Sequence, residues 1–435
     1  MNKAIEIQDK AQCCGCSACF AACPVDAIEM QADAEGFKYP VVDAARCIDC
    51  GKCRQTCPLI NRAAEEEKPQ RVFLAQHRDA AIRQHSTSGG AFTALAQVVL
   101  SRGGIVYGAV YDDQLRVVHR AIERPEDLRL LQGSKYVQSD MQATFRAIKA
   151  HQQAGRLVLF SGTPCQIEGL RLYLWITKSV FFIDLVCRAV PSPKVWSKYK
   201  KSNKFSKTEG TADVRFRDKR YYGYTYAQIV GEDAAGQATY HAGIDSDPML
   251  RAFFSNICDR PSCYQCAFKK RYRVSDLTLW DCFDVGLYDK TFDDNRGTTS
   301  ILVHSEQGLR LLEAASGKKL TQNPVGEPLP ASTFGVGAEQ SEAEGVVPPS
   351  ATSLLRLREL PDDRLPRSAH EMTHSVPMNP RRAAFMADLD TMEPRALFDK
   401  WFPQTWKNRT ARLARILLAR TGLYNKVKRA VKRGR

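Results

Sequence analysis

The sequence reads CCGCSACFAACP from Cys13 to Pro24 and CIDCGKCRQTCP from Cys47 to Pro58. Both stretches carry four cysteines spaced C-x2-C-x2-C-x3-C and followed by proline, and the second copy lies 34 residues after the first. Because this offset is constant, residues 1–65 are predicted to be a duplicated small unit. Short β-type segments at 4–7, 27–30 and 39–42 predict its strands.

The cysteine spacing is that of ligands to iron-sulfur cubes. In such a run three thiolates bind one cube and the fourth cysteine reaches the other cube. Two 4Fe–4S clusters are therefore predicted, one on Cys13, Cys16, Cys19 and Cys57 and the other on Cys47, Cys50, Cys53 and Cys23. Zinc is the alternative, but zinc sites normally use separated C-x2-C pairs. Cys14 falls outside the spacing and is predicted to be no ligand. These residues resemble the bacterial two-cluster ferredoxins.

The composition is that of a folded protein of two or three ordinary domains. The chain has 435 residues, 44% of them hydrophobic, and no apolar run reaches the length of about eighteen residues that a spanning helix needs. The first residues lack the basic start and apolar core of a secretory signal, so we expect a cytoplasmic protein. There, the fifteen cysteines are expected to be thiolate ligands rather than disulfides.

Positive charge is concentrated at the carboxyl end. The net charge is +15, and the stretch from Gln404 to Arg435 contains eleven Lys and Arg but no Asp or Glu. The chain as a whole is therefore not expected to bind nucleic acid. Apolar residues recur at about helical spacing within this tail, namely Leu413, Ile416, Leu417, Leu423, Tyr424, Val427 and Val431. An amphipathic helix that contacts anionic membrane surfaces is predicted, which would make the protein peripheral at the inner face of the membrane; a solvated or partner-docking helix is the alternative.

Between the two ends, apolar β-type runs alternate with amphipathic stretches. Residues 104–111 and 157–160 are predicted to be strands, and residues 91–100 and 141–149 have the apolar spacing of helices. This alternation predicts a mixed α/β body of the size of an enzyme domain.

The predicted fold class is α+β, with a ferredoxin-type (βαβ)2 unit, a mixed α/β body, a linker and a helical basic tail. The body is divided into a first part at 70–150 and a second part at 151–320. Residues 321–353 are rich in Pro, Gly, Ala, Ser and Glu and are predicted to be a flexible linker. Residues 354–435 are predicted to form the last helices and the tail.

A turn with the sequence S-T-S-G-G, from Ser86 to Gly90, lies directly before a predicted helix. Free backbone N–H groups and the positive end of the helix dipole would face an anion there, such as a flavin phosphate. An ordinary N-cap is the alternative interpretation. No G-x-G-x-x-G follows a strand, so a nicotinamide-binding domain is not supported.

Further cysteines lie in distinctive contexts in the body. Cys258, Cys263 and Cys266 are close enough in sequence for one loop to wrap a metal, and they are the firmest predicted ligands of a third cluster. For the fourth ligand, Cys165 is favoured over Cys187 because Thr163-Pro164 predicts a rigid turn after a strand. Cys282 is predicted to be no ligand.

In combination, these motifs resemble the coenzyme F-420 hydrogenase/dehydrogenase beta-subunit family. The resemblance covers about residues 70–315 and rests on the S-T-S-G-G turn, G-S-K-Y-V-Q-S at 133–139, G-T-P-C-Q at 162–166, and R-P-S-C-Y-Q-C at 260–266 followed by Ser275-Asp276. Members are iron-sulfur flavoproteins that bind FAD and exchange hydride with a small molecule, the deazaflavin in the founding members. Others include chlorophyll-reducing enzymes and proteins associated with exopolysaccharide synthesis.

The resemblance implies roles for particular residues. Ser86, Ser88, Gly89 and Gly90 would contact FAD, and Lys135 and Tyr136 would face its ring or the substrate. Residues 70–150 would then be the flavin-binding part of a mixed α/β flavin-binding body. Four of the five thiols at Cys165, Cys187, Cys258, Cys263 and Cys266 would hold the third cluster. Two departures stand out: the family's L-V-C-H-G is L-V-C-R-A at 185–189, and its Gly-Asp-aromatic-Trp-Gly is W-D-C-F-D at 280–284. We therefore expect a substrate pocket unlike that of the deazaflavin enzymes.

The expected function is electron transfer between a small-molecule hydride donor or acceptor, FAD, three clusters and an external redox partner protein. A flavin is suited to this because a hydride carries two electrons and each cluster carries one. Lys135 would supply a fixed positive charge to the reduced flavin. Two alternatives are a non-catalytic electron-transfer subunit that docks the clusters onto a partner, and a peripheral component of a surface-polysaccharide assembly system.

Overall fold

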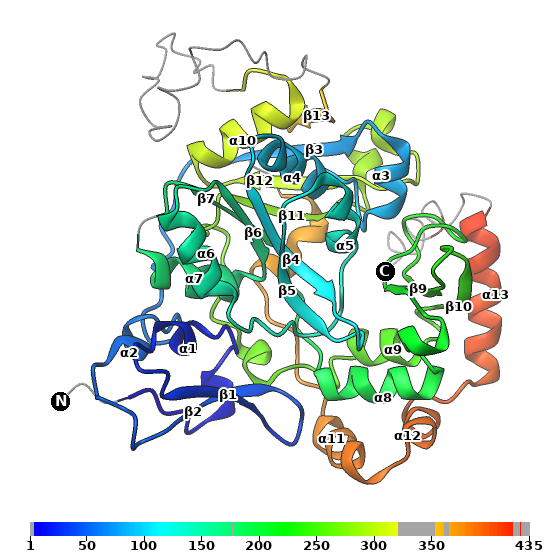
Figure 1. The fold of residues 1–435 in the computed structure, drawn as a ribbon. Helices are drawn as coiled ribbons and strands as arrows, with labels where there is room; N and C mark the ends of the chain where they lie inside the picture. Colours follow the sequence, from blue (N-terminus) through cyan, green and yellow to red (C-terminus); the bar gives the residue numbers. More distant parts are fainter. Residues whose placement is uncertain (1–3, 176, 321–352, 361–364, 421–426, 428–435) are drawn as a thin grey trace.

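The structure, a computed structural model, describes residues 4–175, 177–320, 353–360, 365–420 and residue 427 (Figure 1). Its centre is an eight-stranded mixed sheet in the order β13-β3-β12-β11-β7-β6-β4-β5. The strands are β3 (Arg71–His77), β4 (Ile105–Tyr111), β5 (Val117–Ile122), β6 (Val158–Gly162), β7 (Val180–Leu185), β11 (Leu277–Asp281), β12 (Thr299–Val303) and β13 (Leu355–Glu359).

Strand direction positions the site. β4, β6, β7 and β11 are parallel neighbours or next neighbours, and β3 runs the same way because β12 is antiparallel to both β3 and β11. The carboxyl ends of these five strands therefore meet at one edge of the sheet. Ligands of open α/β sheets bind at that edge.

Helices cover both faces of the sheet, because the strands alternate apolar side chains between the two faces. α4 and α10 pack on one face against Phe73, Val106 and Leu159. α6 and α7 pack on the other face against Tyr107, Phe160 and Phe182. The helices around the sheet are α3 (Ala80–His85), α4 (Ala91–Ser101), α5 (Leu128–Leu131), α6 (Thr144–Gln153), α7 (Pro164–Leu174) and α10 (Glu306–Ser316).

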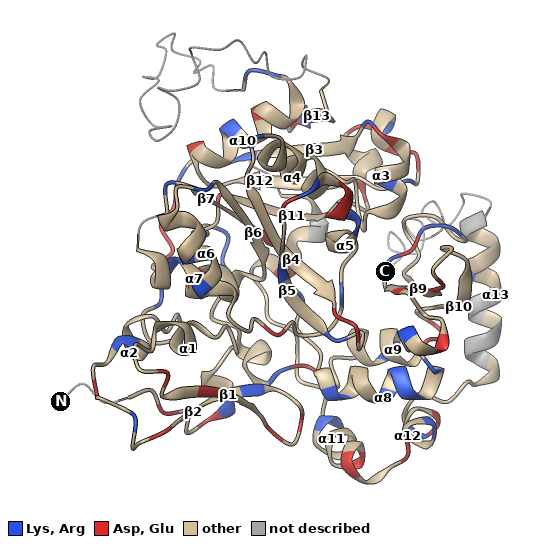
Figure 2. Ribbon diagram, in the orientation of Figure 1, with Lys and Arg blue, Asp and Glu red and all other residues tan. Residues whose placement is uncertain are grey.

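A second core lies beside the sheet, around the buried rings of Trp196 and Tyr199. A small antiparallel sheet contributes to it, with the order β10 (Ala238–Gly243), β9 (Gln228–Glu232) and β8 (Asp213–Arg215). The helices of this part are α8 (Pro193–Asn203), α9 (Pro248–Phe254), α11 (Arg382–Thr391) and α12 (Pro394–Trp401), with α13 (Trp406–Arg420) on the outer side (Figure 1). Basic and acidic side chains are interspersed along the described elements (Figure 2).

The N-terminal unit contains α1 (Ala18–Ala22), α2 (Lys52–Gln55) and one antiparallel hairpin of β1 (Ile28–Ala32) and β2 (Lys38–Val42). The strand predicted at residues 4–7 is wrong. The Ile5 side chain is buried beside Cys19, Ile28 and Cys53, and its backbone N–H donates to the Cys53 sulfur at 3.3 Å. This segment therefore serves the cysteine core instead of a sheet, and the unit is ferredoxin-like without a full (βαβ)2 set of strands.

Within the body, the predicted helices at 91–100 and 141–149 are found as α4 and α6, and the predicted strands at 104–111 and 157–160 are found as β4 and β6. The two predicted parts of the body, 70–150 and 151–320, contribute strands to the same sheet. The prediction for residues 354–435 omitted β13, which pairs with β3. The predicted linker at 321–353 lies, except for Ser353, outside the described residues.

Candidate functional site

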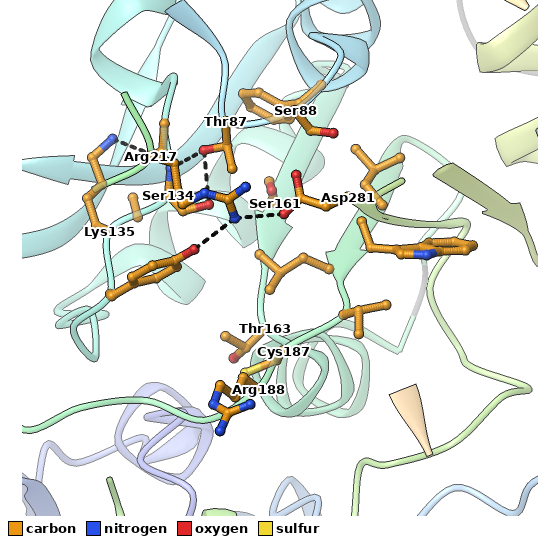
Figure 3. A pocket seen from close by; sticks show the side chains of 18 of the residues that line it. Thr87, Ser88, Ser134, Lys135, Ser161, Thr163, Cys187, Arg188, Arg217 and Asp281 are labelled. Carbon is orange, nitrogen blue, oxygen red and sulfur yellow. Dashed lines mark hydrogen bonds and ion pairs between the residues drawn. The ribbon is translucent and has the colours of Figure 1, made fainter. Parts of the chain in front are cut away.

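A cavity of about 700 Å³ opens at the carboxyl edge of the sheet. Its walls come from the turn at 86–90, the loop at 132–139 and the ends of β6, β7 and β11 (Figure 3). Pockets for cofactors and small molecules commonly have volumes of about 300–1,000 Å³. The cavity is therefore large enough for a cofactor together with part of a substrate.

The turn from Ser86 to Gly90 has a conformation that only glycine allows at its end. Gly90 has φ +85° and is the N-cap of α4, which no side chain caps. A Cβ on Gly89 would overlap the Ala75 carbonyl oxygen and lie 3.0 Å from the Thr299 hydroxyl. The N-terminus of α4 consequently faces the cavity with Gly90 as its N-cap and with no side chain bound to its N–H groups.

Ser86 and Ser88 instead hold the turn in place. The Ser86 hydroxyl donates to the Ile82 carbonyl at 2.8 Å, and the Ser88 hydroxyl donates to the Thr298 carbonyl at 2.7 Å. Both residues line the cavity, as do Thr87 and Gly90. The four predicted flavin-binding residues are thus together in one turn, and their role toward FAD stays a prediction.

Lys219 fixes this turn from behind. Its ammonium donates to the carbonyls of Arg83 at 2.8 Å, Ser88 at 2.5 Å and Arg296 at 2.8 Å, and the residue is 4% exposed. Burial lowers the pKa of Lys219 to about 7. No local motif in the sequence marked this lysine, because its partners lie about 80 to 140 residues away.

Lys135 and Tyr136 lie on the opposite wall. The Lys135 ammonium donates to carbonyls of its own loop, at 2.9 Å to Leu130 and 3.2 Å to Gln132, and burial lowers the pKa of this group to about 8. The Tyr136 ring stacks on Phe253 with 4.2 Å between centroids. Both residues line the cavity. The Lys135 ammonium, however, is bound to the carbonyls of its own loop, and the predicted role of Lys135 toward a flavin stays a prediction.

An ion pair that the sequence did not indicate crosses the cavity wall. The Arg217 guanidinium donates to Asp281 at 2.9 Å, as Figure 3 shows, and to the Tyr136 hydroxyl at 3.3 Å. Burial opposes the charge of Arg217, but Asp281 and Tyr136 outweigh it and raise its pKa. Trp280, at the departure from the family pattern, also lines the cavity, whereas Asp284 lies outside its lining.

Arg188, at the other departure, lies at the cavity beside Cys187 (Figure 3). It forms an ion pair with Glu371 and donates to the Asn256 side chain at 2.8 Å. Glu371 belongs to the 3-10 helix η7 (Arg367–Met372), so a segment from the last part of the chain closes this wall. His119 was likewise not predicted: it lines the cavity, its Nε2 lies 3.1 Å from the Ser161 carbonyl, and burial lowers its pKa to about 4.

The N-terminal cysteines form the two predicted groups. Burial raises the pKa of Cys19, and Cys13 and Cys57 raise it further. For Cys16, a hydrogen bond to Cys14 lowers the pKa, but burial and the charges of Cys19 and Cys57 together outweigh it and raise the pKa. The second group lines a cavity of about 20 Å³, formed in part by Cys23, Cys47, Cys50 and Cys53. The fourth cysteine of each run thus lies with the other run, the crossed arrangement that two cubes require.

Four of the five body thiols lie together. Burial raises the pKa of Cys263, and the neighbouring thiols of Cys187 and Cys266 raise it further. Burial also raises the pKa values of Cys187 and Cys266, and the thiol of Cys165 raises both of them further. Cys258 lies elsewhere, fully buried in the core around Trp196, with Asp259 and Arg382 as its charged neighbours. Cys282 is buried in another core, beside Val72 and Leu302.

Cys14 was set aside by the spacing, yet its thiol lies between two predicted ligands. A hydrogen bond to Cys16 raises its pKa, and another to Cys165 lowers it. Among the described residues, no three His, Cys, Asp or Glu side chains converge closely enough to hold a single metal ion.

Comparison with known proteins places the chain in a family. Residues 72–146 match the profile "coenzyme F420 hydrogenase/dehydrogenase, beta subunit N-term", residues 155–327 match its C-terminal counterpart, and residues 12–59 match a 4Fe-4S dicluster domain. The chain belongs to this beta-subunit family and carries an N-terminal 4Fe–4S dicluster domain. It is an iron-sulfur electron-transfer protein of the beta-subunit type.

A chain from the F420-reducing NiFe hydrogenase complex of Methanosarcina barkeri is similar, with 17% identity and a TM-score of 0.40 over 57% of this chain and 78% of that chain. No curated protein matches the sequence. No described helix is both long and apolar enough to cross a membrane.

Replacing Lys219 by Met is expected to destabilise the protein. The change removes three buried hydrogen bonds from a lysine and leaves three carbonyls without their donor, which should lower the free energy of unfolding by about 2–3 kcal/mol. Urea unfolding followed by circular dichroism measures this. Lys201→Met, at an exposed position of α8, is the matched control; equal effects of the two changes would contradict the role of Lys219.

Proposed function

We propose that the chain is an iron-sulfur flavoprotein oxidoreductase that passes electrons between an FAD and three 4Fe–4S clusters. The single observation that carries the proposal is the adjacency of the cavity and the body thiols. Cys165 and Cys187 line the cavity and also belong to the group of four thiols. A two-electron carrier in the cavity would therefore lie next to a one-electron carrier on the thiols.

The residues of the cavity fit an FAD. The α4 N-terminus and the glycine turn offer backbone N–H groups and a positive dipole end to the phosphates. A Cβ on Gly90 would approach the His77 Cβ to 2.9 Å, so a side chain at this position would displace the turn. When bound, the flavin would accept or donate a hydride and exchange single electrons with a cluster.

The protein's own groups would orient the substrate and shield the reaction from water. Arg217 and Asp281 neutralise each other at 2.9 Å, as Arg188 and Glu371 do on another wall. A hydride donor or acceptor would consequently enter a cavity with little net charge. A deazaflavin-like compound or an intermediate of surface-polysaccharide synthesis is the proposed substrate class; Trp280, at a glycine position of the family pattern, reshapes the space for it.

For the third cluster, we assign Cys165, Cys187, Cys263 and Cys266. The thiols of Cys187 and Cys266 raise the pKa of Cys263, and Cys165 raises the pKa of Cys266, as expected of neighbouring sulfurs. Cys258 is left out because it is buried in the core around Trp196. The backbone N–H of Cys266 donates to the Ser375 hydroxyl at 3.0 Å, and Lys269 donates to the Cys187 carbonyl at 2.5 Å. These bonds hold the two ligand-bearing loops in place. From this cluster, electrons would pass to the N-terminal pair and then to a redox partner protein.

Cys187→Ser is expected to reduce the iron content of the anaerobically purified full chain from about twelve to about eight per chain, because one cube contributes four irons. Cys258→Ser should keep about twelve. Colorimetric iron analysis measures both. A loss of iron in Cys258→Ser, with Cys187→Ser unchanged, would contradict the assigned set of ligands.

Gly90→Val is expected to abolish bound flavin while the N-terminal clusters keep their absorbance. The valine would bring a Cβ to 2.9 Å from the His77 side chain at a residue with φ +85°. Gly155→Val is the matched control, because Gly155 has φ +73° and open space around it. Flavin released by denaturation is measured by fluorescence. Wild-type protein without flavin after reconstitution would favour the alternative of a non-catalytic electron-transfer subunit.

The tail supports a second proposal, that the protein binds anionic membrane surfaces. Ile416 packs toward Tyr222 and Tyr226, and Arg415 pairs with Asp245, so one side of α13 rests on the protein (Figure 1). Trp406, Leu413 and Leu417 are 76%, 66% and 65% exposed. Their spacing of seven and four residues places them on one face of the helix, in the stretch that carries the eleven basic residues.

Replacing Trp406, Leu413 and Leu417 together by Ser is expected to lower binding to vesicles of phosphatidylglycerol and phosphatidylcholine at least tenfold, because the apolar contacts with the lipid are lost. Sedimentation of the full chain with the vesicles measures this. Trp175→Ser, at a residue that is 85% exposed elsewhere on the protein, is the control. Equal sedimentation of the triple variant and the wild type would contradict the proposal.

A further inference from the structure

A buried arginine of the body, Arg260, binds the N-terminal unit. Arg260 is fully buried, and its guanidinium donates to the carbonyls of Cys13 at 2.7 Å and Lys38 at 2.9 Å and to the Gln138 side chain at 2.9 Å. Its charge also lies 4.3 Å from the centre of the Tyr39 ring. Three of these four partners thus come from the N-terminal unit, although Arg260 itself belongs to the body.

Arg260 lies between two groups of thiols. Its guanidinium donates to the Cys13 carbonyl at 2.7 Å, and its backbone carbonyl accepts from the Cys263 N–H at 2.9 Å. Cys13 belongs to the N-terminal group, and Cys263 belongs to the body group. An arginine side chain keeps its proton in proteins, so Arg260 places a positive charge between the two groups.

The two groups also approach each other along α7. Cys165 lies in the first turn of this helix, and a Cβ on Gly169, one turn later, would lie 2.9 Å from the Cys16 sulfur. Four residues of an α-helix span about 6 Å. Gly15 makes a similar approach on the other side, where a Cβ would lie 2.8 Å from the Arg260 guanidinium. The junction therefore has no room for additional side-chain atoms.

The other N-terminal group is further out. Cys47 and Cys50 are only partly buried, and Ile48 between them is 61% exposed. The junction thus sets an order in which the group of Cys13 faces the body and the group of Cys47 faces solvent.

Resting on the proposed function, we propose that Arg260 is a positioning residue that stabilises added electrons on both clusters at the junction. A hydride brings two electrons. The donor would lose a hydride to the flavin, which would gain two electrons and one proton. On reoxidation of the flavin, each of the two adjacent clusters would be reduced by one electron, and the proton would be released to water at the cavity. Two reduced clusters repel each other, and the fixed positive charge between them offsets this repulsion. Arg260 thereby favours the state in which both clusters hold an electron.

The test is a redox titration of the full chain, purified anaerobically and followed by electron paramagnetic resonance. Arg260→Gln should make reduction of the two junction clusters about tenfold less favourable, which is about 59 mV for a one-electron couple. Arg260→Lys, which keeps the charge, should shift them less. The third signal, from the group of Cys47, should not move.

Arg146→Gln is the matched control. Arg146 also joins the unit to the body, donating to the carbonyls of Phe20 at 2.9 Å and Ala21 at 3.1 Å, but its charge is paired with Asp26 at 2.6 Å. This change should leave the potential of the body cluster unaltered. If Arg260→Gln binds about twelve irons and also leaves the potential of the body cluster unaltered, the proposed role of the charge is overturned.

A second variant keeps the test independent of the arginine. Gly169→Ala should move Cys16 away from α7 and weaken the magnetic splitting between the two reduced clusters. An unchanged splitting would contradict the proposed junction. An iron content of about eight in the wild type would instead mean that the body thiols bind no cluster. That outcome would overturn the proposed function together with this inference.

Discussion

The direction of five strands constrains the rest of the molecule. Because β3, β4, β6, β7 and β11 all end at one edge, the turns that follow them converge there. Cys165 and Cys187 each follow one of two adjacent strands, β6 and β7, which lie about 4.8 Å apart as neighbouring strands do. The same pairing that builds the sheet therefore brings the body thiols to the cavity.

The last part of the chain completes the site. β13 pairs with β3 at the edge of the sheet, and the following segment reaches back to the body thiols. The carbonyls of Glu371 and Met372 accept from Lys269 at 2.6 Å and from Arg273 at 3.3 Å, and the Ser375 hydroxyl accepts from Cys266. These residues lie beyond residue 327, where the match to the family ends. One wall of the cavity is therefore a feature of this chain in addition to the shared fold.

The sequence allowed prediction of what depends on short spacing. Cysteine runs a few residues long predicted the two N-terminal groups, and the glycine turn predicted the N-terminus of α4. Contacts between residues that are distant in sequence left no such pattern. Lys219 donates to the carbonyls of Arg83 and Arg296, and Arg260 donates to the carbonyl of Cys13. Proximity in sequence was also misleading for Cys258, because its thiol turns into the core around Trp196 while Cys263 and Cys266 turn toward Cys187.

The charges at the cavity and at the junction are balanced in different ways. Arg217 and Arg188 are each paired with a carboxylate of the same chain. Arg260 has carbonyls, an amide and aromatic rings as partners, and in the described part of the chain it forms no ion pair. A buried cation without an anion is costly. Thiolates that bind a cluster beside Arg260 would supply the missing negative charge. Since such ligands must be deprotonated, cluster binding and the docking of the N-terminal unit stabilise each other. The arginine that joins the two units thus links the folded arrangement to the clusters that the arrangement is proposed to connect.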